Sequence, residues 1–431
     1  MDAINRDVPQ AAVTSNGSGY GLSNGITNGL TNGLKKRISK RLPKRPVEGL
    51  YYKNYFSEDE IQALCSYKNS GADLSLSHIY ILAPMYNYFV TLLPLWLAPN
   101  VITVLGLTFV FLAQTIQLYY NPLLSDACPR WVYALSGVAL WLYQTLDNLD
   151  GRQARRTGSS SPLGHLFDHG CDALNVTISG LTLASTLRLG PSFWALSLIY
   201  FSGYFVFYTA TLEEFFTSCL LLGIINGPNE GLLIMQGLHL ATAVFGSEIW
   251  IKTIDVGMGI AFPAGGGIVL FGLIPSISTA AMNFYNARKK ASGFAVFKAS
   301  LPLLFFTSYA YGWAFWSPTV MKVYPAVFMW VLGLAFFYMA SRMIVSHLTD
   351  ADYPWFIPLL APLAFGTGNA AIGYYFLDGK PPINELVLLS FCLLTILWTN
   401  FRRVYCITHQ ICEHLNIRCF RITPKPPKTK S

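Results

Sequence analysis

DNLDGRQARRTGSSSPLGHLFDHGCD, residues 147–172, places four aspartates in one short stretch of a chain that is otherwise strongly apolar. The 431-residue protein is 53% hydrophobic and 12% charged, whereas globular proteins carry about 25% charged residues. Its mean hydropathy of +0.40 agrees with this deficit of charge and indicates a polytopic membrane protein. Carboxylates are costly inside a membrane, so a cluster of them marks a candidate functional site.

Apolar runs of roughly 20 residues, long enough to cross a bilayer, recur from residue 79 to residue 404. Ten of them predict transmembrane helices: 100–120, 131–150, 162–187, 192–210, 229–247, 262–284, 299–316, 324–346, 354–375 and 383–402. Prolines at 84, 94 and 99 interrupt the run 79–99, so this segment predicts a helix in the membrane interface rather than an eleventh span. The expected fold is an all-α integral membrane protein with about ten transmembrane helices and an N-terminal interfacial amphipathic helix.

Basic residues are distributed asymmetrically among the predicted connections. With a cytosolic N-terminus, the segments 151–161 and 285–298 and the tail after 402 share one side and carry clusters of arginine and lysine, whereas the opposite connections carry isolated basic residues. The positive-inside rule then predicts that both termini and the aspartate cluster are cytosolic. The net charge of +8 follows from this topology, so we expect no nucleic-acid partner.

The two ends of the chain differ from its apolar centre. Residues 1–47 combine a repeated Ser/Thr-Asn-Gly unit with a basic run and predict a disordered cytosolic tail. The predicted organisation continues with an interfacial segment (48–99), a catalytic transmembrane core (100–210), the remaining transmembrane helices (211–404) and a basic cytosolic tail (405–431). The eight cysteines form no disulfide framework, and those near the C-terminus match no common zinc-finger spacing.

The spacing of the aspartates predicts that they converge. Asp147 and Asp150 are three residues apart at the end of one predicted helix, and Asp168 and Asp172 are four apart near the start of the next. Each pair therefore shares a helix face, and the two helices are antiparallel neighbours. An all-carboxylate set selects hard cations such as Mg²⁺ or Mn²⁺. Four carboxylates suit two such ions, the arrangement that clamps a phosphate during in-line displacement.

The residues between the aspartates fit a phosphate site. Gly151, Ala154 and Gly164 are small, which lets a diphosphate approach the backbone, and Arg155 supplies a fork for its oxygens. Isolated intramembrane acids would also suit an ion or solute transporter. The full spacing D-x₂-D-G-x₂-A-R-x₈-G-x₃-D-x₃-D defines eight positions. A pattern of this specificity favours the phosphate site over the transporter.

This pattern resembles the signature of the CDP-alcohol phosphotransferases at all eight positions. Further stretches resemble the eukaryotic choline/ethanolamine phosphotransferase (diacylglycerol cholinephosphotransferase) branch: YKNSGADLS (67–75), PLWLAPNVIT (94–103), SSSPLGHLFDHGCDALN (159–175) and GPNEG (227–231). One departure is APMYN (83–87), where that branch has a Trp-Asn pair.

The resemblance implies a reaction in which a diacylglycerol hydroxyl attacks the phosphorus of CDP-choline or CDP-ethanolamine and CMP leaves. It also implies a homodimer among membrane lipids of the endoplasmic reticulum or a neighbouring membrane such as the Golgi. A related transferase with another acceptor alcohol stays open as an alternative, and the sequence does not decide between choline and ethanolamine.

Further polar residues have candidate roles of their own. Asn100 can contact a cytosine edge or cap a helix. Glu213, Glu214 and Glu230, in an expected cytosolic connection, can face the ammonium headgroup or solvent. For the general base, His169 is a candidate because imidazole ordinarily titrates near physiological pH, whereas a metal-bound carboxylate such as Asp172 is a poor proton acceptor.

Overall fold

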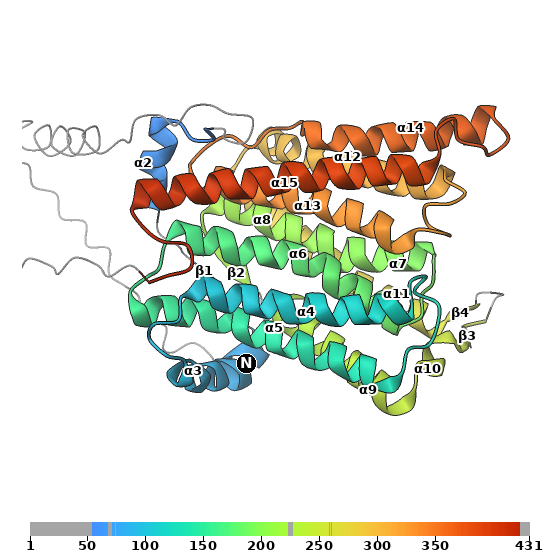
Figure 1. The fold of residues 1–431 in the computed structure, drawn as a ribbon, viewed down its shortest axis with the longest axis horizontal. Helices are drawn as coiled ribbons and strands as arrows, with labels where there is room; N and C mark the ends of the chain where they lie inside the picture. The colour runs from blue at the N-terminus through green and yellow to red at the C-terminus, as the bar shows by residue number, and fades with distance from the viewer. Residues whose placement is uncertain are drawn as a thin grey trace, which may run out of the picture. The chain divides into compact units, whose positions relative to one another are not determined.

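The computed structural model describes residues 54–67, 71–73, 75–222, 227–257, 259 and 261–422. The predicted tail 1–47 lies outside the described residues, as does the end of the chain after 422. Long helices packed side by side make up most of the described chain (Figure 1). The all-α prediction is confirmed, with four three-residue strands added to it.

Each of the ten predicted apolar runs overlaps a helix or a series of continuous helical segments. These are α4 (Pro99–Tyr120), α5 (Arg130–Thr157), α6 (Pro162–Thr186), α7 (Phe193–Ile199) with η2 (Tyr200–Phe205) and α8 (Val206–Thr217), η3 (Gly227–Gly231) with α9 (Leu232–Phe245), α11 (Ala264–Lys290), α12 (Gly293–Trp316), α13 (Pro325–Leu348), α14 (Ala361–Phe376) and α15 (Glu385–Leu415). The sequence pattern therefore predicted the helical elements correctly.

Six of these helical segments, among the described residues, are long and apolar enough to cross a membrane: α4, α7–η2–α8, α11, α12, α13 and α15. Helices α5 and α6 have sufficient length, 28 and 25 residues, but they carry the charged signature. Helices α9 and α14 are shorter, at 14 and 16 residues. The chain is an integral membrane protein.

The N-terminal part of the described chain forms short helices. Helix α2 (Glu58–Ser66) begins at a capping box, in which Ser57 Oγ accepts from the Glu60 amide and the Glu60 carboxylate accepts from the Ser57 amide. The π-helical turn η1 (His78–Leu82) leads directly into α3 (Ala83–Leu92). Together η1 and α3 have 15 residues, too few to span a bilayer, so the run 79–99 forms no eleventh transmembrane helix.

Short connections complete the fold. Strand β1 (Gly71–Asp73) pairs in parallel with β2 (Leu220–Leu222), and β3 (Thr253–Asp255) pairs antiparallel with β4 (Ala261–Pro263). The single-turn helices α10 (Glu248–Ile251) and η4 (Pro358–Leu360) precede α11 and α14. None of these elements contributes a residue of the predicted site.

The junction of α5 and α6 positions the signature. Helix α5 continues to Thr157, beyond the predicted end at residue 150, so only 158–161 separate it from α6. Gly158 makes this tight turn with a φ of +66°, a left-handed value that glycine adopts without steric cost. Ser161 then begins α6 by accepting from the Gly164 amide. The short turn brings the two aspartate pairs to the same end of neighbouring helices.

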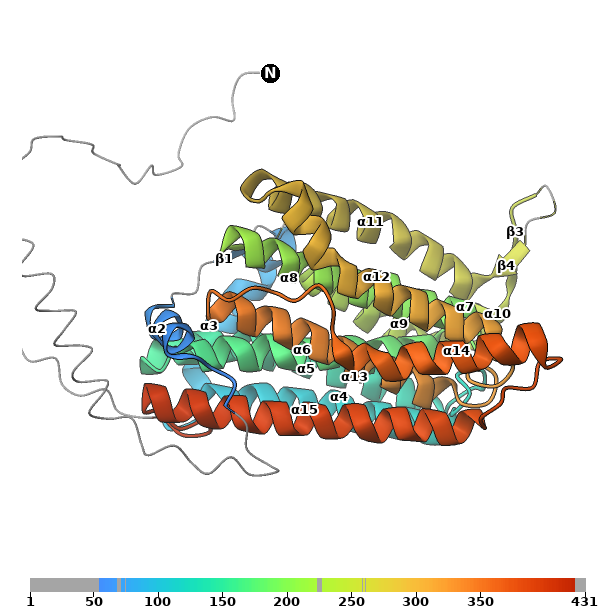
Figure 2. The same ribbon diagram turned by 90° about the horizontal axis from the view of Figure 1, so that it is seen from above.

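Helix α13 forms the centre of the main hydrophobic core and packs against α6, α8 and α15 (Figure 2). Its contact with α6 depends on Gly333. A Cβ added at Gly333 would lie 2.3 Å from Thr177 Oγ1 and 2.8 Å from Thr177 Cβ. Small residues let membrane helices approach closely in this way.

Gly333→Ala should therefore destabilise the protein, because the new methyl group would force α6 and α13 apart. Overpacking of this kind typically costs about 1–3 kcal/mol. The measurement is the unfolding temperature of the full chain in detergent. Gly368→Ala on α14 is the matched control, because a Cβ there meets nothing within 4 Å. Equal unfolding temperatures for both variants would contradict the assigned contact.

Candidate active site

Three carboxylates meet where α5 and α6 approach each other. Asp147 on α5 and Asp168 and Asp172 on α6 each offer an oxygen atom, and these atoms lie within 4.8 Å of one another. Asp147 Oδ1 is buried and has no hydrogen-bond partner. A buried carboxylate oxygen without a partner is costly, so its occurrence in a residue grouped with two further carboxylates fits a bound cation.

Asp150 lies beside this trio and is buried. The Thr103 hydroxyl of α4 donates to its Oδ2, while Asp147 and Asp168 lie close enough to repel it electrostatically. The Tyr143 hydroxyl, one turn before Asp147, donates to Asp172 Oδ1 at 2.5 Å. The sequence interpretation missed both donors, because a threonine and a tyrosine on apolar helices give no signal before their partners are known.

The chemistry of this donor set suits a divalent metal. All the candidate ligand atoms are carboxylate oxygens, which hard cations such as Mg²⁺ and Mn²⁺ prefer. No lysine or arginine forms an ion pair with Asp147, Asp150, Asp168 or Asp172 in the described part of the chain. The residues present therefore fit a metal site.

Small residues next to the carboxylates leave the helix backbone accessible. A Cβ built on Gly151 would meet only Arg155 Nη1, at 3.6 Å, and one on Gly164 would have no contact shorter than 3.8 Å. Ala154, between Gly151 and Arg155 on the same helix, adds only a methyl group. A ligand can therefore approach the backbone of both helices here.

Three arginines near the C-terminal end of α5 differ in what they contact. Arg152 Nε donates to Asn87 Oδ1, and Arg156 Nη1 donates to the Val90 and Leu93 carbonyls, so both hold the segment around α3. Arg155 is exposed and has no hydrogen-bond or ion-pair partner among the described residues. The signature arginine is thus the one that remains available to a ligand.

Asn100 is buried at the start of α4, but it does not cap the helix, because the N-cap position is Ala98. Its amide nitrogen donates to the Cys419 carbonyl at 2.9 Å, which ties α4 to the segment after α15. A Cβ built on Gly164 would lie 3.9 Å from Asn100 Oδ1, so the amide borders the open surface.

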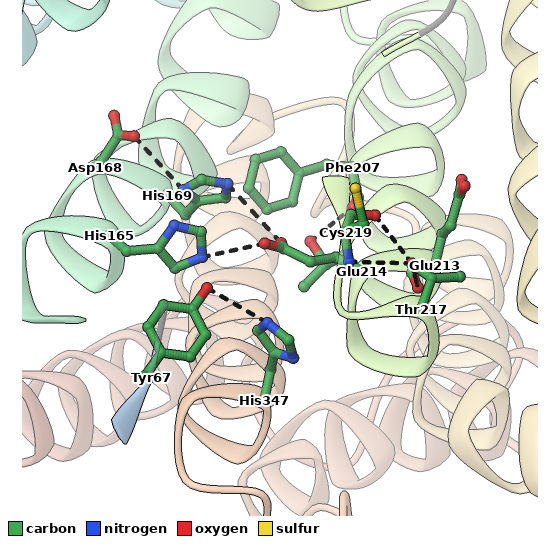
Figure 3. Close-up of polar contacts among 11 residues, drawn as sticks. Tyr67, His165, Asp168, His169, Phe207, Glu213, Glu214, Thr217, Cys219 and His347 are labelled. Carbon is green, nitrogen blue, oxygen red and sulfur yellow. Dashed lines mark hydrogen bonds and ion pairs between the residues drawn. The ribbon is translucent and has the colours of Figure 1, made fainter. Parts of the chain in front are cut away.

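A second polar cluster adjoins the aspartates and joins α6 to α8 (Figure 3). His165 Nε2 lies 3.3 Å from Glu214 Oε1, and His169 Nε2 lies 4.0 Å from Glu214 Oε2. On its other side, His169 Nδ1 lies 3.6 Å from Asp168 Oδ2. His169 therefore bridges the carboxylate trio and Glu214.

The placement of Glu213 and Glu214 in a connection was wrong, and neither side chain faces solvent. Helix α8 continues to Thr217, and both side chains are buried on it. Glu213 accepts from the Asn286 amide of α11 at 2.9 Å, whereas Glu214 faces the two histidines. Burial next to histidine rather than water gives Glu214 a role that its position in the sequence did not indicate.

Tyr67 and His347 close the cluster beneath His165, as Figure 3 shows. Their side chains approach at 3.4 Å between Tyr67 Oη and His347 Nε2, and the Tyr67 ring packs 5.8 Å from the His165 ring. Burial, with the Glu214 carboxylate nearby, raises the pKa of the Tyr67 phenol, which therefore stays protonated.

Comparisons with known proteins cover the site and most of the chain. The family model described as CDP-alcohol phosphatidyltransferase matches residues 96–217, the segment from α4 to α8. Choline/ethanolaminephosphotransferase 1 of Arabidopsis thaliana is 35% identical over 398 residues, which cover 86% of this chain and 99% of that protein. Choline/ethanolaminephosphotransferase 1 of Saccharomyces cerevisiae is 34% identical over 335 residues, covering 72% and 83%. Cholinephosphotransferase 1 of the same yeast is 30% identical over 336 residues, with the same shares covered.

Proposed function

Because this chain belongs to the CDP-alcohol phosphatidyltransferase family, we propose that it transfers phosphocholine, phosphoethanolamine or both from the CDP-alcohol to diacylglycerol and releases CMP. The observation that carries this proposal is the convergence of carboxylates from α5 and α6 beside open backbone and an available arginine. The names of the similar plant and yeast proteins support the same pair of headgroups. The chain is a transferase of this class.

The metal requirement is the first part of the proposal. The family uses a divalent metal, and we assign Asp147, Asp150, Asp168 and Asp172 as the ligands of two Mg²⁺ or Mn²⁺ ions. Such ions, when bound, neutralise charge on the diphosphate and on the leaving CMP. Thr103 and Tyr143 orient two of these carboxylates through their hydroxyl groups.

The CDP-alcohol would lie over the open surface of the signature. Gly151, Ala154 and Gly164 leave room for the diphosphate, and the exposed Arg155 guanidinium binds its oxygens through two parallel N–H groups. Asn100, at the edge of that surface, is assigned to the cytosine, whose edge both donates and accepts hydrogen bonds.

His169 is assigned as the general base. The attacking hydroxyl must lose a proton, and an imidazole held between two acidic groups is oriented for that transfer. Asp172 is less suited, because one of its oxygens already accepts from Tyr143 and the other is assigned to the metal. Glu214 positions His169 by facing its other nitrogen.

The proposal extends to membrane setting and assembly. We propose that the site and both termini lie in the cytosol, which the positive-inside pattern supports, and that the membrane is that of the endoplasmic reticulum or the Golgi. The apolar acceptor, diacylglycerol, then reaches the site from the bilayer, and the CDP-alcohol reaches it from the cytosol. We assign residues 100–210 to the catalytic core and residues 211–404 to acceptor access and dimerisation. The proposed assembly is a homodimer.

One assay tests the function directly. The purified full chain is supplied with diacylglycerol, Mg²⁺ and either CDP-choline or CDP-ethanolamine, and CMP release is followed together with the phospholipid product. Release that requires diacylglycerol is expected with at least one donor, and the ratio of kcat/KM values assigns the headgroup. CMP release with a soluble acceptor such as inositol, and none with diacylglycerol, would reject the proposed acceptor.

Arg155→Lys should raise the KM for the CDP-alcohol, because an ammonium group cannot reproduce the bidentate fork. The loss of one charge-assisted hydrogen bond corresponds to about tenfold. Steady-state kinetics at saturating diacylglycerol measure it. Arg156→Lys is the matched control, since Arg156 already donates to the Val90 and Leu93 carbonyls. An unchanged KM for Arg155→Lys would remove this residue from the phosphate site.

A further inference from the structure

Two arginines approach each other between α13 and α15, away from the signature. Arg403 on α15 is 5% exposed, and Arg342 on α13 is half-buried and close enough to repel it electrostatically. Neither forms an ion pair with a carboxylate in the part of the chain that the structure describes. Two like charges therefore share one partly buried space without a counter-charge.

Aromatic side chains form the surroundings of this arginine pair. The Arg403 guanidinium lies 5.1 Å from the centre of the Tyr338 ring and 5.6 Å from that of the Tyr55 ring. Arg342 Nη1 donates to the Tyr338 hydroxyl at 3.3 Å. The neighbouring Arg402 has a buried Nε with no hydrogen-bond partner. Among the described residues, the side chains that these two guanidinium groups are seen to contact are neutral tyrosines.

The simpler explanation is that Arg403 anchors the N-terminal segment through Tyr55. That segment is already tied to α15, because the Tyr55 amide donates to Gln410 Oε1 at 2.9 Å. Cation–π contacts also offset part of the cost of burying one guanidinium. They do not account for the second guanidinium beside it, since arginine cannot lose its proton and the repulsion remains.

A bound anion would offset the repulsion between the two guanidinium groups. Arginine forks match the oxygens of a phosphate in paired, nearly planar contacts, and such contacts are strongest where water is excluded. The pair lies toward the end of the bundle that holds the active site, since His347, five residues after Arg342, contacts Tyr67 near Glu214. By the positive-inside argument this is the cytosolic end, where the membrane leaflet is rich in anionic phospholipids.

We propose that Arg342 and Arg403, with Tyr338 and Tyr55 around them, bind a phosphate group at a site separate from the catalytic carboxylates. A phospholipid headgroup and free inorganic phosphate both carry this chemistry. The site rests on α13 and α15, and it is independent of the proposed transfer reaction.

The test measures binding by the full chain in detergent with EDTA and without any CDP-alcohol, so that the metal site does not contribute. The probes are dioctanoyl phosphatidic acid, dioctanoylglycerol, which lacks the phosphate, and inorganic phosphate, and native mass spectrometry gives the affinity of each. The variants are Arg342→Gln and Arg403→Lys. Arg288→Gln, which removes an exposed arginine at the end of α11, is the matched control.

Phosphatidic acid should bind about tenfold more weakly to Arg342→Gln than to the wild type or Arg288→Gln, because charge-assisted hydrogen bonds are lost. Arg403→Lys keeps the charge and the fold but loses the fork, and it should weaken binding in the same direction. Unchanged binding of dioctanoylglycerol shows that the variants are folded. If inorganic phosphate competes with phosphatidic acid, free phosphate is a ligand of the site. If inorganic phosphate does not compete, the ligand is the lipid headgroup. Equal affinity of all variants for phosphatidic acid overturns the proposal.

Discussion

Asp168→Asn is expected to abolish the transfer of the phosphoalcohol. Asp168 belongs to the carboxylate trio and also lies 3.6 Å from His169, so the change removes both a candidate metal ligand and a partner of the base. Metal-ion stabilisation of transition-state charge amounts to several kcal/mol, which corresponds to a loss of about 10²–10³-fold or more in kcat. Asp147→Asn should have a comparable effect, because Asp147 belongs to the same trio and its buried Oδ1 has no hydrogen-bond partner.

Chelation provides the complementary measurement. EDTA should reduce CMP release by the wild-type protein to the level of Asp168→Asn, and Mg²⁺ or Mn²⁺ should restore it only in the wild type. Asp126→Asn is the control, because Asp126 is an exposed aspartate in the connection between α4 and α5. Full activity in excess chelator would contradict the metal assignment, whatever the aspartate variants do.

His169→Ala should lower turnover by about 10²–10⁴-fold while leaving metal-dependent binding of the CDP-alcohol intact, which is the range for a positioned base. His169 contacts carboxylates on both sides, Asp168 and Glu214, and so it is held in place independently of the substrate. Turnover is measured by CMP release and binding by equilibrium titration of the CDP-alcohol with metal present.

His165→Ala separates the role of His169 from that of the cluster. His165 faces the same Glu214 from one turn earlier, at 3.3 Å, but among the described residues it forms no ion pair with an aspartate, as His169 does with Asp168. We expect it to lower turnover less than His169→Ala does. If His169→Ala loses binding in parallel with turnover, His169 is a structural neighbour of Asp168, and Asp172 becomes the better candidate for the base.

The helices and the first set of site residues could be predicted because both depend on local periodicity. Apolar runs of spanning length gave the ten helical elements. Spacings of three and four residues place two side chains on one helix face in any fold. The meeting of Asp147 with Asp168 and Asp172 followed once α5 and α6 were neighbours in the chain.

The helix boundaries were predicted less well, since a membrane helix does not end where its apolar run ends. Helix α5 continues through the polar residues 151–157, and α8 continues through Glu213 and Glu214. Backbone hydrogen bonds extend a helix as long as the chain offers no stop signal, and the left-handed residues Gly158 and Ser218 provide those stops. The pattern of hydrophobicity therefore assigned the two glutamates to a connection, whereas both are buried on a helix.

Sequence alone determined that this is a membrane protein of many helices with four aspartates converging at one end of two of them, because hydropathy and helical periodicity act over short distances along the chain. Only the tertiary structure decided that Glu214 faces His169, that Asn100 bonds to the Cys419 carbonyl 319 residues away, and that Arg342 meets Arg403. Those contacts depend on which helices pack together and at what rotation. Helix pairing and rotation are determined by how side chains fit together, as Gly333 does against Thr177, and no local sequence pattern encodes that fit.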